Sequence, residues 1–117
     1  MKKLLIIDDQ KGIRLLLNEV FSMEYYEVYQ AANGMEALQI VTKEPIDCIL
    51  LDMRIPGMNG IEILREIREK NFNMPIFMMT AFEEGEMLAE AKKLGVIKFT
   101  TFFSLFLLPL FFHFLML

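Results

Sequence analysis

Three carboxylates and one hydroxyl stand at the ends of short apolar runs. Asp8 and Asp9 close the run "LLII", Asp52 closes "CILL", and Thr80 closes "IFMM". Two adjacent carboxylates beside a buried strand repel each other and lose solvation, so their ionised forms are costly without a counter-charge. A few carboxylates together with water ligands suit Mg²⁺ in octahedral coordination. These residue types therefore indicate a magnesium site with open positions for phosphate oxygens.

Such a site has a definite chemistry. A carboxylate beside Mg²⁺ can attack a phosphoryl group and form an acyl phosphate, which Thr80 could then bind through a hydrogen bond. The alternative is that each aspartate only caps the next helix and that Thr80 is an ordinary strand residue. Capping explains Asp52 poorly, because a Pro-Gly-Asn-Gly loop separates it from the next helical pattern. A phosphohydrolase would share the acidic pocket, but no second general acid stands beside the nucleophile.

The elements that must position these residues follow from hydrophobic periodicity. Short apolar runs alternate with amphipathic segments, which is the pattern of βα units in a parallel sheet. Strands are predicted at 3–7, 27–32, 47–53, 74–81 and 96–101, and helices at 12–23, 33–44, 61–70 and 83–95. Asn33 and Asn59 are expected helix caps, and Gly95 is expected to end the last helix. The predicted fold is α/β, with a doubly wound five-stranded parallel sheet whose working residues gather at the carboxyl ends of the strands.

Size, charge and cysteine content limit the classes of partner. The 117 residues suit a single domain, and the net charge of −4 lacks the basic stripe that a nucleic-acid surface needs. No nucleic-acid partner is therefore expected, and no output domain follows the predicted elements. Cys48 is the only cysteine and lies in an apolar run, so a buried thiol and a reducing, cytoplasmic setting are expected.

At this point the motifs identify a family. "IIDDQ", "LLDMRIPGMNG" and "MMTA", in this order and spacing, resemble the receiver domains of two-component response regulators. "QAANGMEAL" and "IPGMNGIEIL" resemble, more closely, the single-domain receivers of sporulation phosphorelays. The resemblance implies a flavodoxin-like strand order 2-1-3-4-5. It also implies a phosphoacceptor that takes a phosphoryl group from the phosphohistidine of a sensor histidine kinase and passes it to a histidine phosphotransferase in sporulation control.

The resemblance implies roles for single residues as well. Asp52 would accept the phosphoryl group and Thr80 would be the switch hydroxyl. Mg²⁺ would be held by Asp8, Asp9, Asp52 and the backbone carbonyl of Arg54.

A docking face for a histidine-bearing helical bundle is also implied on the first helix and the loop before it. Its residues would be Gln10, Gly12, Ile13 and Leu16. Ile13 and Leu16 also share helical spacing with Leu17 and Val20, so core packing is the alternative role for both.

The sequence departs from the family after Lys98. Phe102 stands where the family has a lysine that pairs with the phosphoryl oxygens, and Phe103 stands where it has a proline. Lys98 cannot replace that lysine, because four residues of strand span roughly 13 Å. The predicted receiver domain therefore covers residues 1–98. Residues 99–117 form an apolar Phe/Leu-rich tail in place of an amphipathic last helix.

Three explanations of the tail stay open. A shifted reading frame or truncation would explain the abrupt change in composition. A membrane anchor would suit the length of the tail and the lysines before it, although Pro109 interrupts the run. The tail could also fold back over the sheet.

The replacement of the family lysine by Phe102 leaves two alternative functions open. One is a binding module, impaired in phosphorylation, that sequesters a kinase or phosphotransferase. The other is a decayed regulator.

Overall fold

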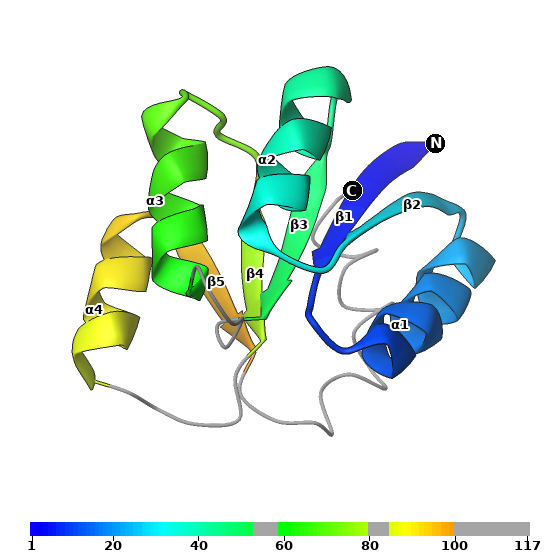
Figure 1. Cartoon of the computed structure of the whole chain (residues 1–117), viewed down its shortest axis with the longest axis horizontal. Helices are drawn as coiled ribbons and strands as arrows, with labels where there is room; N and C mark the ends of the chain where they lie inside the picture. Colours follow the sequence, from blue (N-terminus) through cyan, green and yellow to red (C-terminus); the bar gives the residue numbers. More distant parts are fainter. Residues whose placement is uncertain (53–58, 80–84, 100–117) are drawn as a thin grey trace.

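A parallel sheet with helices on both faces forms the described part of the chain, which in this computed structural model comprises residues 1–52, 59–79 and 85–99 (Figure 1). The strands are β1 (Lys2–Ile7), β2 (Tyr26–Ala31), β3 (Cys48–Asp52), β4 (Ile76–Met79) and β5 (Val96–Phe99). The helices are α1 (Lys11–Met23), α2 (Gly34–Lys43), α3 (Gly60–Glu69) and α4 (Gly85–Lys93). The sheet order is β2-β1-β3-β4-β5, with every neighbouring pair parallel.

The α/β class and the order of the first four strands confirm the sequence prediction. Three strands were predicted to end at 53, 80–81 and 100–101, and the last helix was predicted to begin at 83–84. These positions lie outside the described residues. So does the tail from residue 100 onward. Within the described ranges, no helix has the length and apolar composition needed to cross a bilayer.

Helices cover both faces of the sheet (Figure 1), and the buried apolar side chains form one core on each face. One core joins alternate residues of β1, β3 and β4 to α2, α3 and α4, with Ile49, Leu64 and Ala91 among its fully buried members. The other joins the remaining sheet residues to Leu17 and Phe21 of α1. Every residue from Cys48 to Leu51 is fully buried, as predicted for a central strand covered on both faces. Burial raises the pKa of the Cys48 thiol to about 12, so this thiol stays protonated at neutral pH.

Local capping explains where the helices begin and end. The side chain of Asn33 accepts a hydrogen bond from the amide of Glu36 at 2.9 Å, and that of Asn59 accepts one from the amide of Glu62 at 3.0 Å. Both predicted caps are confirmed. Gly95 follows α4 with φ of 81°, the left-handed conformation that glycine adopts without a steric penalty.

The fourth strand begins later than the sequence pattern predicted. The strand expected from residue 74 starts at Ile76. Pro75 has no amide hydrogen to donate, although its carbonyl accepts a hydrogen bond from the amide of Ile49 at 3.0 Å. Regular pairing therefore begins one residue after the proline, and Ile49 pairs with Ile76.

One arginine ties three chain segments together at the end of α3. The guanidinium of Arg68 donates to the carbonyls of Leu94 at 2.9 Å, Phe72 at 2.9 Å and Met74 at 2.8 Å. These carbonyls belong to the turn after α4 and to the segment before β4. Arg68 therefore holds the entry to β4 against the end of α4.

Arg68→Ala should lower the free energy of unfolding by about 2–3 kcal/mol, because hydrogen bonds from a charged donor contribute about 1.5–3 kcal/mol each and these are only partly shielded from water. Urea denaturation followed by circular dichroism measures this change. Arg65→Ala is the matched control, since Arg65 makes an exposed ion pair with Glu90 and should cost far less. Equal losses in the two variants would contradict the role of the carbonyl contacts.

Candidate metal centre

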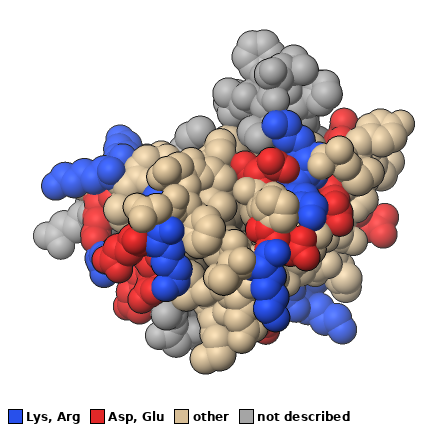
Figure 2. Space-filling model, turned by 90° about the horizontal axis from the view of Figure 1, so that it is seen from above, with Lys and Arg blue, Asp and Glu red and all other residues tan. Residues whose placement is uncertain are grey.

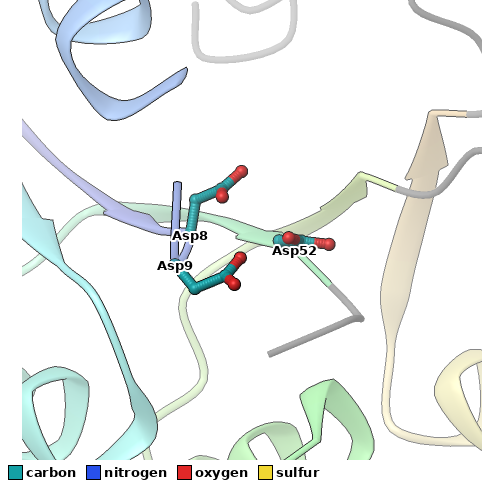
Figure 3. A group of neighbouring side chains, drawn as sticks. All are labelled: Asp8, Asp9 and Asp52. Atoms are coloured by element: carbon teal, nitrogen blue, oxygen red, sulfur yellow. The ribbon is translucent and has the colours of Figure 1, made fainter. Parts of the chain in front are cut away.

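The strand register brings three aspartates to one edge of the sheet. Ile7 pairs with Leu51, so the residues that follow them, Asp8 and Asp52, leave the sheet side by side. Asp9 comes next after β1. Carboxylate oxygens from all three lie within 4.8 Å of one another, and Figure 3 shows the three side chains projecting toward a common space. The sequence prediction named these three residues as ligands, and the structure brings them together.

The three carboxylates differ in their exposure to water. Asp8 is 5% exposed, whereas Asp52 is half-buried and Asp9 is exposed. Burial raises the pKa of Asp8 to about 6, and the negative charges of Asp52 and Asp9 act in the same direction. The ionised cluster is therefore electrostatically unfavourable without a cation, which is the condition that a metal site relieves.

Backbone contacts hold Asp8 in place. The carboxylate oxygen Oδ1 of Asp8 accepts a hydrogen bond from the amide of Gln10 at 2.8 Å, and the Asp8 amide donates to the carbonyl of Ala31 at 3.0 Å. The guanidinium of Arg14 donates to the Asp8 carbonyl at 2.8 Å. Sequence reasoning did not single out Arg14. The sequence feature that points to Arg14 is its position in the first turn of α1, close to the loop that carries Asp8 and Asp9.

The helix-capping alternative is wrong for all three aspartates. The residue that caps α1 is Gln10, whose side chain makes no capping hydrogen bond, and the residue that caps α3 is Asn59. None of the aspartates occupies a cap position, so helix formation does not explain their placement.

The donor set fits a small hard cation. Oxygens on opposite sides of an octahedral Mg²⁺ lie about 4.2 Å apart, given metal–oxygen distances of about 2.1 Å. The three carboxylate oxygens lie within 4.8 Å of one another and would have to move closer together on one ion, because at least two of their three pairs would occupy adjacent positions about 3.0 Å apart. Three carboxylates also leave room for the water and phosphate ligands that Mg²⁺ retains.

The predicted docking residues surround the start of α1. Gln10 and Gly12 are exposed, and a Cβ added at Gly12 would meet nothing within 4 Å. Leu16 is 50% exposed, so the core-packing alternative is wrong for this residue. Ile13 is partly buried and packs against the core cluster under α1, so part of its side chain contributes to the core.

Three further predicted residues fall outside the part of the chain that the structure describes. They are Arg54, Thr80 and Phe102. Met79, which precedes Thr80, pairs with Asp52 across β3 and β4. The roles of these three residues stay predictions.

Residues 4–101 match the response regulator receiver domain family. Sporulation initiation phosphotransferase F of Bacillus subtilis is 55% identical over 96 residues, which cover 82% of this chain and 77% of that protein. Regulatory protein AtoC of Escherichia coli is 35% identical over 95 residues, which cover 81% of this chain and 21% of that longer protein.

Solved structures agree with this assignment. Chemotaxis protein CheY4 of Vibrio cholerae superposes with a TM-score of 0.84 at 31% identity, covering 94% of this chain and 96% of that one. Response regulator protein TrrA of Thermotoga maritima, solved in complex with Mg²⁺ and BeF, has a TM-score of 0.77 at 33% identity, covering 87% and 89%. The chain therefore belongs to the family of response regulator receiver domains.

Proposed function

We propose that this chain is the phosphoacceptor of a histidine–aspartate phosphorelay in sporulation control. It takes a phosphoryl group from the phosphohistidine of a sensor kinase onto Asp52 and passes it to a histidine phosphotransferase. The observation that carries the proposal is the convergence of three carboxylates at the ends of β1 and β3 in a receiver fold. The 55% identity to a sporulation initiation phosphotransferase supports the pathway.

The transfer is a displacement at phosphorus. A carboxylate oxygen of Asp52 attacks the phosphorus atom, the P–N bond to the kinase histidine breaks, and that imidazole keeps the bonding electron pair and takes up a proton. Attack by a phosphotransferase histidine on the resulting aspartyl phosphate passes the group on. Mg²⁺, held by Asp8, Asp9, Asp52 and the carbonyl of Arg54, would supply positive charge to the phosphoryl oxygens. The TrrA complex with Mg²⁺ and BeF supports a role for Mg²⁺ by analogy.

The protein contributes position and charge. Contacts from Gln10 and Arg14 hold Asp8 beside Asp52. Asp8 and Asp9 repel an incoming phosphate, so transfer should require a divalent cation. Thr80 would donate a hydrogen bond from its hydroxyl to the transferred group.

Partners of this function are proteins with a histidine-bearing bundle rather than nucleic acids. The face seen in Figure 2 intersperses acidic and basic side chains, without a continuous basic stripe. A net charge of −4 and the single buried cysteine suit a protein partner in the reducing cytoplasm.

The exposed leucines of α1 allow a test of the docking face. Leu16→Glu should slow phosphoryl transfer from the kinase at least tenfold, because a charge replaces half-exposed apolar surface in the interface. Transfer from the small donor phosphoramidate and the melting temperature should stay nearly unchanged. Leu15→Glu is the matched control. Leu15 is similarly exposed, at 49%, but as the preceding residue it points about 100° away from Leu16 around the helix. Equal slowing in both variants would contradict a docking face centred on Leu16.

The replacement at residue 102 favours a second candidate function. Without the lysine that the family places there, the chain would bind a kinase or phosphotransferase through α1 and sequester it without efficient transfer. The intact acidic cluster favours the phosphoacceptor; Phe102 favours the sequestering module.

Phe102→Lys should therefore raise the yield of phosphorylated protein at least tenfold, since a charge-assisted contact to phosphoryl oxygens contributes about 1.5–3 kcal/mol. The yield is measured on gels that retard phosphorylated protein. Phe103→Lys is the control for a nonspecific effect of added charge. No difference between Phe102→Lys and the native chain would show that residue 102 does not contact the phosphoryl group.

The direct test uses the native chain with radiolabelled phosphoramidate and with a labelled histidine kinase. Label that requires Mg²⁺ and is released by hydroxylamine, which cleaves acyl phosphates, supports the phosphoacceptor. Stable kinase binding without label would instead establish the sequestering module.

A further inference from the structure

Three hydrogen bonds close a ring between the acidic turn after β1 and the first turn of α1. Oδ1 of Asp8 accepts from the amide of Gln10 at 2.8 Å, and the carbonyl of Gln10 accepts from the amide of Arg14 at 3.1 Å. The guanidinium of Arg14 donates in return to the carbonyl of Asp8 at 2.8 Å. The ring therefore begins and ends at Asp8, the buried member of the acidic cluster.

Helix geometry places Arg14 to make this contact. Side chains of an α-helix tilt toward its amino end, so the guanidinium of Arg14 reaches back over the loop before α1. The start of α1 also lacks two common stabilising features, because Gln10 makes no side-chain capping hydrogen bond and the first turn contains no acidic residue. The ring therefore fixes an end of α1 that no side-chain cap holds, whereas asparagine caps hold α2 and α3.

The same ring fixes the backbone that carries two of the three carboxylates. The Asp8 amide donates to the carbonyl of Ala31 on β2 at 3.0 Å, so Asp8 is held from the sheet as well. Asp9 lies between the two ends of the Asp8–Gln10 hydrogen bond, so its backbone is constrained although its side chain is exposed. Figure 3 shows both carboxylates projecting from this turn toward Asp52. Loss of the Arg14 contact would release one side of the turn and let both carboxylates move relative to Asp52.

We infer that Arg14 is a positioning residue for the cation site, which holds the acidic turn in the conformation that places Asp8 and Asp9 beside Asp52. This inference rests on the proposed function, in which these carboxylates hold Mg²⁺. Arg14 acts through the Asp8 carbonyl and not on the transferred group. Because α1 also carries the exposed Leu16, the ring joins the cation site and the proposed docking helix into one unit.

The charge of Arg14 and its positioning contact affect Mg²⁺ binding in opposite directions. A guanidinium repels a second cation nearby, so if charge were its only influence, removing Arg14 would tighten Mg²⁺ binding. Positioning predicts the reverse, because removing a group that orients metal ligands typically weakens metal affinity by about 10–100-fold. The sign of the change in Mg²⁺ affinity therefore separates the two roles.

Calorimetric titration of the full chain with MgCl₂ tests the inference. Arg14→Ala should raise the dissociation constant for Mg²⁺ about tenfold or more. Arg14→Lys keeps the charge and can donate one hydrogen bond, so its dissociation constant should lie between those of the native chain and Arg14→Ala. Lys11→Ala removes an exposed cation from the same turn of α1 and should not weaken binding. An affinity in Arg14→Ala equal to or tighter than that of the native chain would overturn the inference.

A matched variant separates positioning from a general loss of stability. Phe21→Leu alters the buried side of α1 away from the ring and should lower the melting temperature without changing the Mg²⁺ affinity. The titrations are run at a temperature where circular dichroism shows every variant to be folded. Equal weakening of Mg²⁺ binding in Phe21→Leu and Arg14→Ala would contradict a specific role for Arg14.

Amide hydrogen exchange gives a second readout that does not depend on phosphoryl transfer. Mg²⁺ should slow the exchange of the first hydrogen-bonded amides of α1 in the native chain, and should slow it much less in Arg14→Ala. Equal slowing in both would also overturn the inference. A chain that shows the expected order of Mg²⁺ affinities but takes no label from phosphoramidate would instead overturn the proposed phosphoacceptor function alone.

Discussion

Asp52→Asn abolishes phosphoryl incorporation, with an expected loss on the order of 10³-fold or more. The amide oxygen of asparagine is a far weaker nucleophile than a carboxylate, and no acyl phosphate can form on it. The substitution keeps the size of the side chain, so the fold of β3 should be retained. Incubation with radiolabelled phosphoramidate and Mg²⁺, followed by gel electrophoresis, measures the effect.

Asp47→Asn provides a matched control, because Asp47 directly precedes the same strand at its other end. The carboxylate of Asp47 accepts a hydrogen bond from the amide of Lys3 at 2.7 Å, which the asparagine oxygen can also accept. This variant should be labelled like the native chain. Label that persists in Asp52→Asn would assign the acceptor role to another residue and contradict the proposal.

Asp8→Asn should stabilise the metal-free protein at neutral pH and weaken its response to Mg²⁺. Burial and the neighbouring carboxylates raise the pKa of Asp8 to about 6, so ionising this group in the folded state is unfavourable. Removing the charge should raise the free energy of unfolding by about 1–2 kcal/mol in EDTA, after allowance for solvent screening at the sheet edge. Asparagine can still accept the hydrogen bond from the amide of Gln10.

The sign of the pH dependence follows from the same shift. The folded chain binds the Asp8 proton more tightly than the unfolded chain, whose carboxyl has its ordinary pKa of 3.8. The Asp8 contribution to stability is therefore most favourable below pH 4, declines as the pH rises toward 6, and is level above that. Asp8→Asn should lack this decline in urea denaturation series run in EDTA.

Magnesium provides the second readout of the same variant. Saturating Mg²⁺ should raise the melting temperature of the native chain, since a ligand that binds only the folded state stabilises it. The rise should be much smaller in Asp8→Asn and unchanged in Glu19→Gln, which alters an exposed acid on α1. An equal rise in Asp8→Asn and the native chain would exclude Asp8 from the cation site.

The secondary structure was predictable because its signals are local. Asparagine at 33 and 59 caps a helix through its own side chain, and Gly95 ends one through its own conformational freedom. The uniformly apolar run at β3 needs no partner information to be recognised as a central strand. The start of β4 was less predictable, because the missing amide of Pro75 matters only once β3 pairs beside it.

The faces of α1 show where local signals end. Ile13, Leu16 and Leu17 all fit an apolar helical face, so the sequence pattern does not separate the core side from the exposed side. Packing against the sheet makes that choice: Leu17 is buried, whereas Leu16 is half exposed. Residues for partner docking can be distinguished from core residues only after the helix is placed.

For this protein, the sequence by itself determined the order of the strands and helices along the chain, the three aspartates at the strand ends and the chemistry expected of them, because each depends on residue type and short spacing. Only the tertiary structure decided that Asp8 is the buried member of the acidic pair, that Arg14 holds its carbonyl, and that Leu16 faces outward. The physical reason is that the burial of a side chain and the repulsion between carboxylates depend on how β1, β3 and α1 pack together. These elements are separated in sequence and meet only when the sheet forms.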